Sequence, residues 1–163
     1  LMYQGPADKK IEIMHDQQTG AGGLALGLVT MLTTAFCIAQ INQNFIVQSL
    51  ITCEASAKLA MVVMARVGKS AHKGMNTYFI DAMHGHNQNI RLVVALLIAL
   101  GTASSLLNIV GFAAVTAGLP VALVLTAVSN RHFKGVTGDV LGATNELTRL
   151  ASLIVVLVVT RWV

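Results

Sequence analysis

Long apolar runs separated by short polar segments are the dominant pattern of this chain. The five runs are residues 21–39, 45–65, 92–110, 112–129 and about 147–162. A helix needs about 20 mostly apolar residues to cross the roughly 30 Å hydrocarbon core of a bilayer, and the runs reach or approach that length. The third and fourth runs are joined by a tight link near residues 108–111. The pattern predicts an all-α fold: a polytopic integral membrane helical bundle with about five transmembrane helices, forming a single membrane domain over residues 1–163.

Composition supports a membrane location. Hydrophobic residues make up 55% of the chain and charged residues 11%, with a mean hydropathy of +0.70, whereas a soluble domain carries about a quarter charged residues. Because no basic cluster is interleaved with aromatic residues, we expect a lipid membrane as a partner and no nucleic acid. Cys37 and Cys53 lie inside apolar runs without metal-ligand spacing, so both should be reduced and buried.

The first residue, Leu1, lies in a polar and partly charged segment. This start differs from a signal peptide, in which a basic start is followed at once by an apolar core. We therefore expect the chain to be a fragment of a longer protein.

Charged residues predict the orientation of the bundle. If the five helices alternate in direction, nine basic residues fall on one side: Lys9, Lys10, Arg66, Lys69, Lys73, Arg91, Arg131, Lys134 and Arg149. Only Arg161 falls on the other side, while Lys58 is within a run. By the positive-inside rule, the N-terminus and residues 66–91 and 130–149 face the cytoplasm. The sequence thus predicts a multi-pass protein of the cell membrane whose polar chemistry faces the cytoplasm.

A polar motif, GVTGDVLGATNEL, occupies residues 135–147 between two apolar stretches. In a helix, Asp139, Gly142 and Glu146 fall at positions i, i+3 and i+7 on one face. The two carboxylates are then about two turns, or about 10 Å, apart, a spacing that suits divalent cations or phosphates. The alternative is a cytoplasmic loop with a glycine-rich turn and a solvated helix start.

The neighbours of these carboxylates also fit a binding site. Asn145 lies beside Glu146 at the edge of the same face. Gly138 and Gly142 form a small-xxx-small pair, which lets a second helix or a ligand approach the backbone closely.

Glu54 and Lys58 are charged residues within the second apolar run. Their i, i+4 spacing allows an ion pair on one helix face. Ionisable residues inside a membrane usually face the bundle interior or a wet cavity, and we expect the same here. A purely structural ion pair, or a lysine that reaches to the membrane interface, is the alternative reading.

Three further polar features carry weaker signals. Asp16 is either a metal ligand or a helix cap before the first run. His84 and His86 form an HGH sequence without carboxylate support, which is a weak indication of metal. His72 and Lys73 form a basic loop that fits phosphate or lipid headgroups, or that simply determines topology.

The motif at residues 135–147 closely resembles the most characteristic motif of the cobalamin synthase family, the adenosylcobinamide-GDP ribazoletransferases. The segment IEIMHDQQTGAGGLALGL resembles the I-M-x-D-x-x-x-G segment of that family. The segment ASAKLAMVVMARVGKSAHKG resembles its R-W-A-M segment and the following basic loop, with Lys58 where arginine is usual and Leu59 where tryptophan is usual. The resemblance covers essentially the whole chain.

This resemblance implies an enzyme that joins adenosylcobinamide-GDP to α-ribazole or its 5′-phosphate and releases GMP, late in cobalamin biosynthesis. It implies Mg²⁺ as cofactor, and an acidic D-G-x-x-D-x-x-D segment upstream of Leu1. The resemblance therefore also implies that the chain is the C-terminal part of the enzyme. The residues implied are Asp139, Glu146 and Asn145 for catalysis, Lys58, Gly138 and Gly142 for substrate binding, and Asp139, Glu146 and Asp16 for metal.

Two other classes of function fit the same residues. In a transporter or ion-translocating subunit, Glu54, Lys58 and Asp139 would form a relay along a pathway. A non-catalytic assembly protein would instead pack through its glycine faces.

Overall fold

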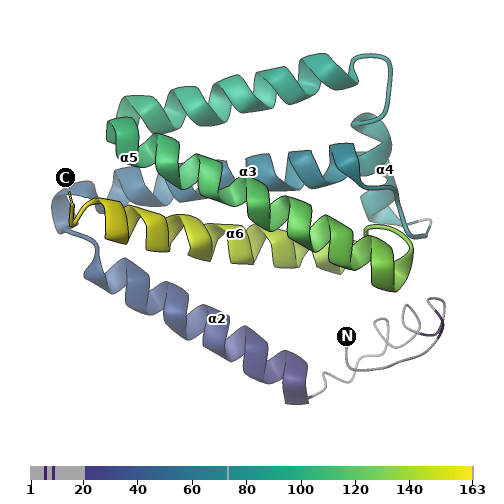
Figure 1. The fold of residues 1–163 in the computed structure, drawn as a ribbon, viewed down its shortest axis with the longest axis horizontal. Coiled ribbons are helices and arrows are strands. Elements are labelled where there is room, and N and C mark those ends of the chain that lie inside the picture. The colour runs from purple at the N-terminus through teal and green to yellow at the C-terminus, as the bar shows by residue number, and fades with distance from the viewer. Residues whose placement is uncertain (1–5, 7–8, 10–20, 73, 163) are drawn as a thin grey trace.

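A computed structural model of the chain describes residues 6, 9, 21–72 and 74–162 (Figure 1). Its elements are α2 (Ala21–Gln40), a short 3-10 turn η1 (Gln43–Phe45), α3 (Ile46–Val67), α4 (Met75–Ala82), α5 (Gln88–Phe133) and α6 (Gly138–Val159). Within the described residues the structure is helical, and one isolated β-bridge joins two loops. The prediction of an all-α fold is confirmed.

Four of these helices, α2, α3, α5 and α6, are long and apolar enough to cross a membrane. Helix α5 is interrupted at Asn108, whose φ of 50° and ψ of −127° are not helical. Figure 1 shows the chain reversing direction there, so residues 88–107 and 109–133 cross the bundle in opposite senses. The five predicted apolar runs therefore correspond to α2, α3, the two halves of α5, and α6. The last apolar run, from about residue 147, lies in a helix that begins earlier, because α6 starts at Gly138 and carries the polar motif within it.

The reversal in α5 requires a very close approach of its two halves. A Cβ atom at Gly111 would lie 2.1 Å from the carbonyl oxygen of Ala103, so only glycine fits at this position. Asn108 has a positive φ, a backbone conformation in which asparagine is enriched among non-glycine residues. Local chemistry at these two positions explains the tight link predicted near residues 108–111.

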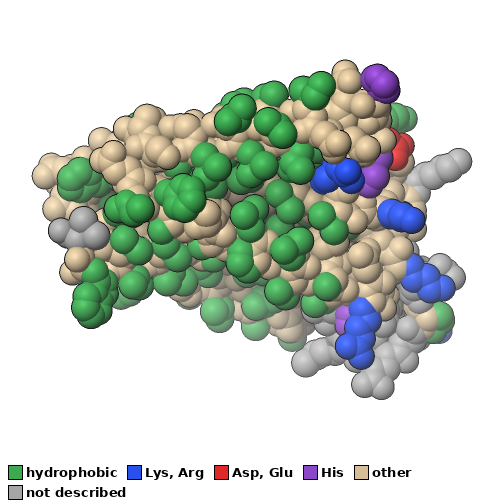
Figure 2. Space-filling model, turned by 45° about the horizontal axis from the view of Figure 1, so that its top comes forward, with side chains coloured by type: hydrophobic (Ala, Val, Ile, Leu, Met, Phe, Trp, Pro, Cys, Tyr) green, Lys and Arg blue, Asp and Glu red, His purple; other side chains and the backbone are tan. Residues whose placement is uncertain are grey.

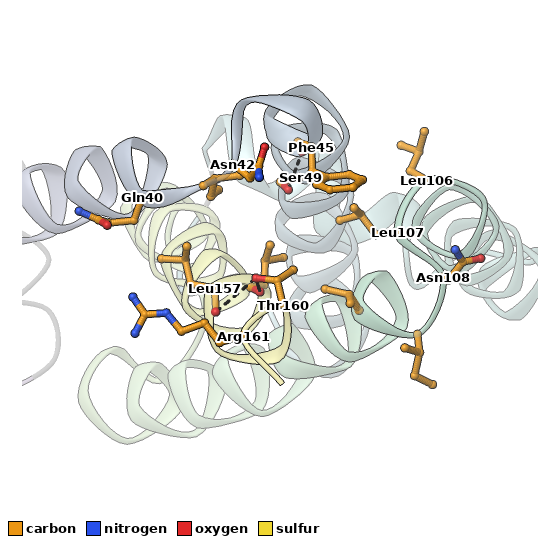
Figure 3. Close-up of a pocket in the computed structure, with 14 residues that line it drawn as sticks. Gln40, Asn42, Phe45, Ser49, Leu106, Leu107, Asn108, Leu157, Thr160 and Arg161 are labelled. Carbon is orange, nitrogen blue, oxygen red and sulfur yellow. Dashed lines mark hydrogen bonds between the residues drawn. The ribbon is translucent and has the colours of Figure 1, made fainter. Parts of the chain in front are cut away.

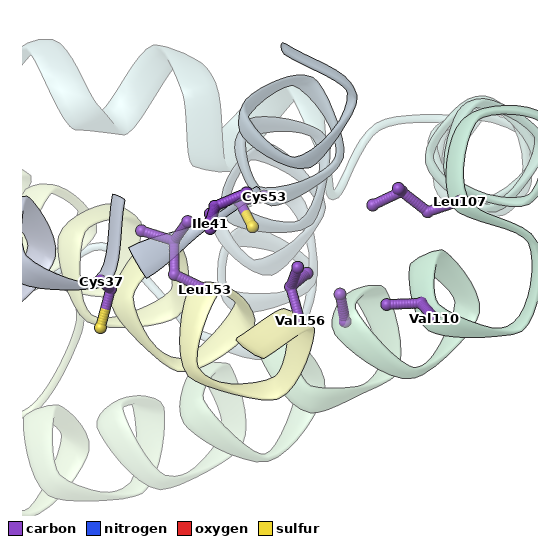
Figure 4. Packing of buried hydrophobic residues seen from close by; sticks show 8 residues of the cluster. Cys37, Ile41, Cys53, Leu107, Val110, Leu153 and Val156 are labelled. Atoms are coloured by element: carbon purple, nitrogen blue, oxygen red, sulfur yellow. The ribbon is translucent and has the colours of Figure 1, made fainter. Parts of the chain in front are cut away.

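The centre of the bundle is α3, which packs against both α5 and α6 (Figure 1). A cluster of buried apolar side chains joins α2, α3, α5 and α6 near one end (Figure 4); it consists of Cys37, Ile41, Cys53, Leu107, Val110, Ala114, Leu153 and Val156. Cys37 and Cys53 are free thiols in this cluster, as predicted. Deeper in the bundle, the Ser152 hydroxyl donates to Ser56 Oγ at 2.8 Å and lies 2.9 Å from the Ala114 carbonyl oxygen.

The outer surface of the bundle is apolar. Exposed fractions of 62% at Leu26, 72% at Met31 and 67% at Leu97 would be unfavourable in water but suit contact with lipid chains. Figure 2 shows hydrophobic side chains over most of one face and Lys and Arg side chains gathered at one end. We call this the basic end; it holds Arg66, Lys69, Arg91, Arg131 and Lys134. The chain is a multi-pass membrane protein.

Candidate functional site

The first three residues of the polar motif hold two loops of the basic end together. The Val136 amide donates to the Lys69 carbonyl at 2.7 Å, and the Ala71 amide donates to the Val136 carbonyl at 3.1 Å. Val136 is fully buried. A Cβ atom on Gly135 would lie 2.6 Å from the Ala71 nitrogen, so the loops can meet this closely only with glycine there. This pairing places the start of α6 beside the end of α3.

Thr137 begins the helix. Its hydroxyl accepts a hydrogen bond from the Val140 amide at 3.3 Å, which satisfies one of the free donors of the first turn. The motif is therefore helical from Gly138 onward, after a short turn at residues 135–137. An exposed helix start after a glycine-containing turn agrees with both alternatives drawn from the sequence, the cation or phosphate site and the solvated helix start. Residues 135–137 therefore serve the structure by joining the two loops and capping α6.

The first two turns of α6 present an open face. A Cβ atom added to Gly138 or Gly142 would meet no atom within 4 Å, so no other described helix packs there. Asp139 is exposed, and its carboxylate makes no hydrogen bond or ion pair with any described residue. The sequence predicted that these glycines let either a second helix or a ligand approach the backbone of α6. Within the described residues no second helix does so, and the open space beside both glycines leaves room for a ligand.

One turn further along, four charged residues join α3 to α6. Glu54 is the centre: its Oε1 lies 2.9 Å from Lys58 Nζ, as the i, i+4 spacing predicted. Its Oε2 accepts from Arg149 Nε at 3.0 Å and from Arg149 Nη2 at 2.8 Å, so one carboxylate oxygen receives two charge-assisted hydrogen bonds from the neighbouring helix. Arg149 Nη1 also contacts Glu146 Oε2 at 2.6 Å.

Asn145 closes this group into a ring. Lys58 Nζ donates to Asn145 Oδ1 at 3.0 Å, and Asn145 Nδ2 donates to Glu146 Oε1 at 3.1 Å. We call Glu54, Lys58, Asn145, Glu146 and Arg149 the polar ring. It holds two carboxylates and two cations, so its formal charge is zero, which lowers the cost of placing four charges within membrane helices.

The ring borders two grooves. Glu146 and Arg149 line a groove of about 670 Å³ between α2 and α6, whose walls include Gly23 and Gly27. Glu54 and Lys58 line a groove of about 450 Å³ between α3 and the first half of α5. The predicted placement of Glu54 and Lys58 in the bundle holds only in part, because their side chains pair with α6 yet remain 42% and 58% exposed.

Arg149 was missed as a site residue by the sequence reasoning, which assigned it to a cytoplasmic loop. It lies in the middle of α6 and is the least exposed of the four charged side chains, at 27%. One sequence signal for its pairing was available, since Glu146 and Arg149 stand three positions apart on a helix. Its second partner, Glu54, is 95 residues away and is identified only by the packing of α3 on α6.

The metal prediction stays open. No group of three or more His, Cys, Asp or Glu side chains capable of holding a metal occurs among the described residues. Asp16, the third predicted ligand, lies outside them. Both Glu146 oxygens are engaged in the polar ring, so of the two described candidates only Asp139 has a free carboxylate. His84 bonds through Nδ1 to the Ile80 carbonyl.

A bundle of lipid-facing helices with a charged ring between two of them defines a multi-pass membrane protein with an intramembrane polar site. A family model described as cobalamin-5-phosphate synthase matches residues 1–157. The chain belongs to this family, as the resemblance of its motifs predicted. No solved structure matches the chain.

Curated relatives carry the name adenosylcobinamide-GDP ribazoletransferase. One from Methanocella arvoryzae is 34% identical over 94% of this chain and 62% of its own length. Another, from Archaeoglobus fulgidus, is 32% identical over 91% of this chain and 60% of its own length. A third, from Thermococcus kodakarensis, is 30% identical over 98% and 66%. The chain thus spans less than two thirds of the length of these relatives.

Proposed function

We propose that this chain forms part of the active site of an adenosylcobinamide-GDP ribazoletransferase of cobalamin biosynthesis. In the proposed reaction, a ribose hydroxyl of α-ribazole or its 5′-phosphate attacks the cobinamide-linked phosphorus of adenosylcobinamide-GDP. A new phosphorus–oxygen bond forms, the bond to the second phosphate breaks, GMP leaves, and the hydroxyl proton is released. Catalysis of such a transfer consists chiefly of positioning the phosphates and stabilising charge.

The observation that carries the proposal is the meeting of two separate motifs. Lys58 comes from the segment that resembles the family's R-W-A-M motif, and Asn145 and Glu146 come from the GVTGDVLGATNEL motif. The 3.0 Å hydrogen bond from Lys58 to Asn145 brings both into the polar ring. The match to the family does not by itself place the two motifs side by side; the contact in the structure does.

Within the ring, Lys58 is the residue best suited to contact a phosphate. Its side chain is the most exposed of the four charged ones, at 58%, and it borders the groove between α3 and α5. Lysine binds phosphate as a compact charge on a flexible stem. Arg149 is held by two carboxylates, so its task is to keep Glu54 and Glu146 in place.

The open face of α6 is the proposed place of the diphosphate and of Mg²⁺. Asp139 offers a free carboxylate, and Glu146 offers a second once its contact with Arg149 is exchanged; Asp16 is the proposed third ligand. Hard oxygen donors of this kind suit magnesium. When bound, the ion would spread the negative charge that builds up on the diphosphate. Gly138 and Gly142 leave room for phosphate oxygens to approach the helix backbone.

Orientation follows from charge. The basic end, with the start of α6 and the open face, is proposed to face the cytoplasm, in accord with the positive-inside rule. Both substrates would then reach Asp139 from the cytoplasm.

The test is a turnover assay with the complete enzyme, measuring GMP and cobalamin product from adenosylcobinamide-GDP and α-ribazole. Asp139→Asn should lower the rate by about two orders of magnitude or more, because a lost metal ligand removes several kcal/mol of charge stabilisation. The matched control is Asp81→Asn, which neutralises an exposed carboxylate in α4 and should leave the rate unchanged. Added magnesium should partly restore Asp139→Asn. Near-normal turnover of that variant would refute the proposed role of the motif.

A further inference from the structure

A cavity of about 510 Å³ lies at the end of the bundle opposite the basic end. Its walls come from the α2–α3 connection, the reversal in α5 and the end of α6 (Figure 3). The floor belongs to the buried apolar cluster of Figure 4, through Ile41, Leu107, Val110 and Val156. The rim is polar, with side chains of Gln40, Asn42, Asn108, Thr160 and Arg161. A buried apolar floor under a polar rim suits an amphiphilic ligand.

Arg161 is the charged group of this rim. Its guanidinium makes no hydrogen bond or ion pair with another residue of the described chain. Within residues 21–72 and 74–162, the other lysines and arginines lie in the polar ring or at the basic end, so Arg161 is the cation of this end of the bundle there. A guanidinium carries five donors in a planar fork that matches the oxygens of a phosphate. Figure 3 shows Gln40 and Arg161 on the same side of the cavity, at the left of the view, so an amide lies on the side of the cation.

The surroundings of the rim place it at the membrane interface. Trp162 follows Arg161 directly and is 86% exposed. Tryptophan is enriched where the headgroups begin, because its ring is apolar and its N–H is polar. Below the rim, Ile109 and Phe112 are 65% and 47% exposed on the outer surface of α5, where acyl chains can lie.

We propose that this cavity binds the phosphate of an anionic phospholipid, with Arg161 as the contacting cation and the exposed apolar surface of α5 beside the acyl chains. The phosphate is the recognised group. The interfacial position and the adjoining apolar surface favour a lipid over free phosphate. The site lies at the opposite end of the bundle from Asp139, so it is independent of the proposed transferase reaction.

The chain contains one tryptophan, Trp162, which makes the site directly observable. The protein is reconstituted in nanodiscs of phosphatidylcholine that contain a small fraction of either brominated phosphatidylglycerol or brominated phosphatidylcholine. Bromine quenches tryptophan only at short range, so quenching reports which lipid resides beside Trp162. We expect the anionic lipid to be preferred by about five-fold, the effect of one basic side chain at a membrane surface.

Three variants and one competitor test the assignment. Arg161→Gln should abolish the preference, whereas Arg161→Lys should retain most of it. Arg131→Gln removes a cation from the basic end, at the far end of the bundle from Trp162. It should leave the lipid preference measured by Trp162 quenching unchanged. Millimolar inorganic phosphate should not reduce the quenching. Equal quenching by both lipids, an unchanged preference in Arg161→Gln, or displacement by inorganic phosphate would each overturn the proposal of a lipid site.

Discussion

Lys58 Nζ lies 3.0 Å from Asn145 Oδ1, although 87 positions separate the two residues in the chain. The hydrogen bond joins the middle of α3 to the N-terminal third of α6. Asn145 in turn donates a hydrogen bond to the carboxylate of Glu146. The amide of Asn145 can serve both neighbours because it offers an acceptor to the ammonium and a donor to the carboxylate. Asn145 therefore sets the distance between the cation and the carboxylate of the proposed site.

Lys58→Gln and Lys58→Arg should differ strongly in their effect on the complete enzyme. Glutamine removes the positive charge, so turnover should fall at least ten-fold, since about 1.4 kcal/mol of lost transition-state stabilisation already has that effect. Arginine keeps the charge and can reach Glu54 and Asn145, so most of the activity should remain. The measurement is kcat/KM for adenosylcobinamide-GDP. Equal loss in both variants would show that the shape of the lysine, and not its charge, matters.

The contact between Glu54 and Arg149 should contribute measurably to stability. Because both side chains are only partly buried, we expect a coupling of about 1 kcal/mol between them. A double-mutant cycle with Glu54→Gln and Arg149→Gln, followed by unfolding in denaturing detergent, gives this number. Strict additivity of the two single variants would contradict a direct contact between Glu54 and Arg149. Lys69→Gln, at the basic end and outside the polar ring, is the control for loss of a positive charge.

Gly111→Ala should weaken the reversal in α5. The new Cβ would lie 2.1 Å from the Ala103 carbonyl oxygen, which is backbone and cannot rotate away. We expect a loss of about 1–3 kcal/mol in the free energy of unfolding, as for overpacked cores. Gly101→Ala is the matched control in the same helix, because its Cβ would meet no atom within 4 Å. An equal effect of the two substitutions would mean that the halves of α5 do not approach as described.

Cysteine labelling tests the topology. After replacing Cys37 and Cys53 with alanine, Gln43→Cys and His86→Cys each place one thiol at an exposed position in a connection between helices. A membrane-impermeant maleimide should reach position 86 from the cytoplasmic side and position 43 from the opposite side. Lys134→Cys should behave like His86→Cys, because both lie at the basic end. Reaction of positions 43 and 86 from the same side would disprove the alternating arrangement.

The amino-acid sequence alone determined the features that depend on near neighbours in the chain. Apolar length specified the membrane helices, because a helix must match the thickness of the hydrocarbon core. The Glu54–Lys58 pair followed from helical spacing, and it is present at 2.9 Å. The tight link near residues 108–111 was visible as a short interruption between two apolar runs, and the chain reverses there.

The tertiary structure alone decided which helices face one another, and hence which polar residues share a site. From the sequence, Arg149 was assigned to a cytoplasmic loop. In the structure it lies in α6, and Glu54 of α3 is 2.8 Å from its guanidinium. Gly118 and Gly142 have the same local freedom, but a Cβ at Gly118 would lie 2.6 Å from Ser56 Oγ, whereas one at Gly142 would meet open space. The physical reason is that spacing along a helix defines a face but not its neighbour. That neighbour is chosen by the packing of small and large side chains over the whole bundle.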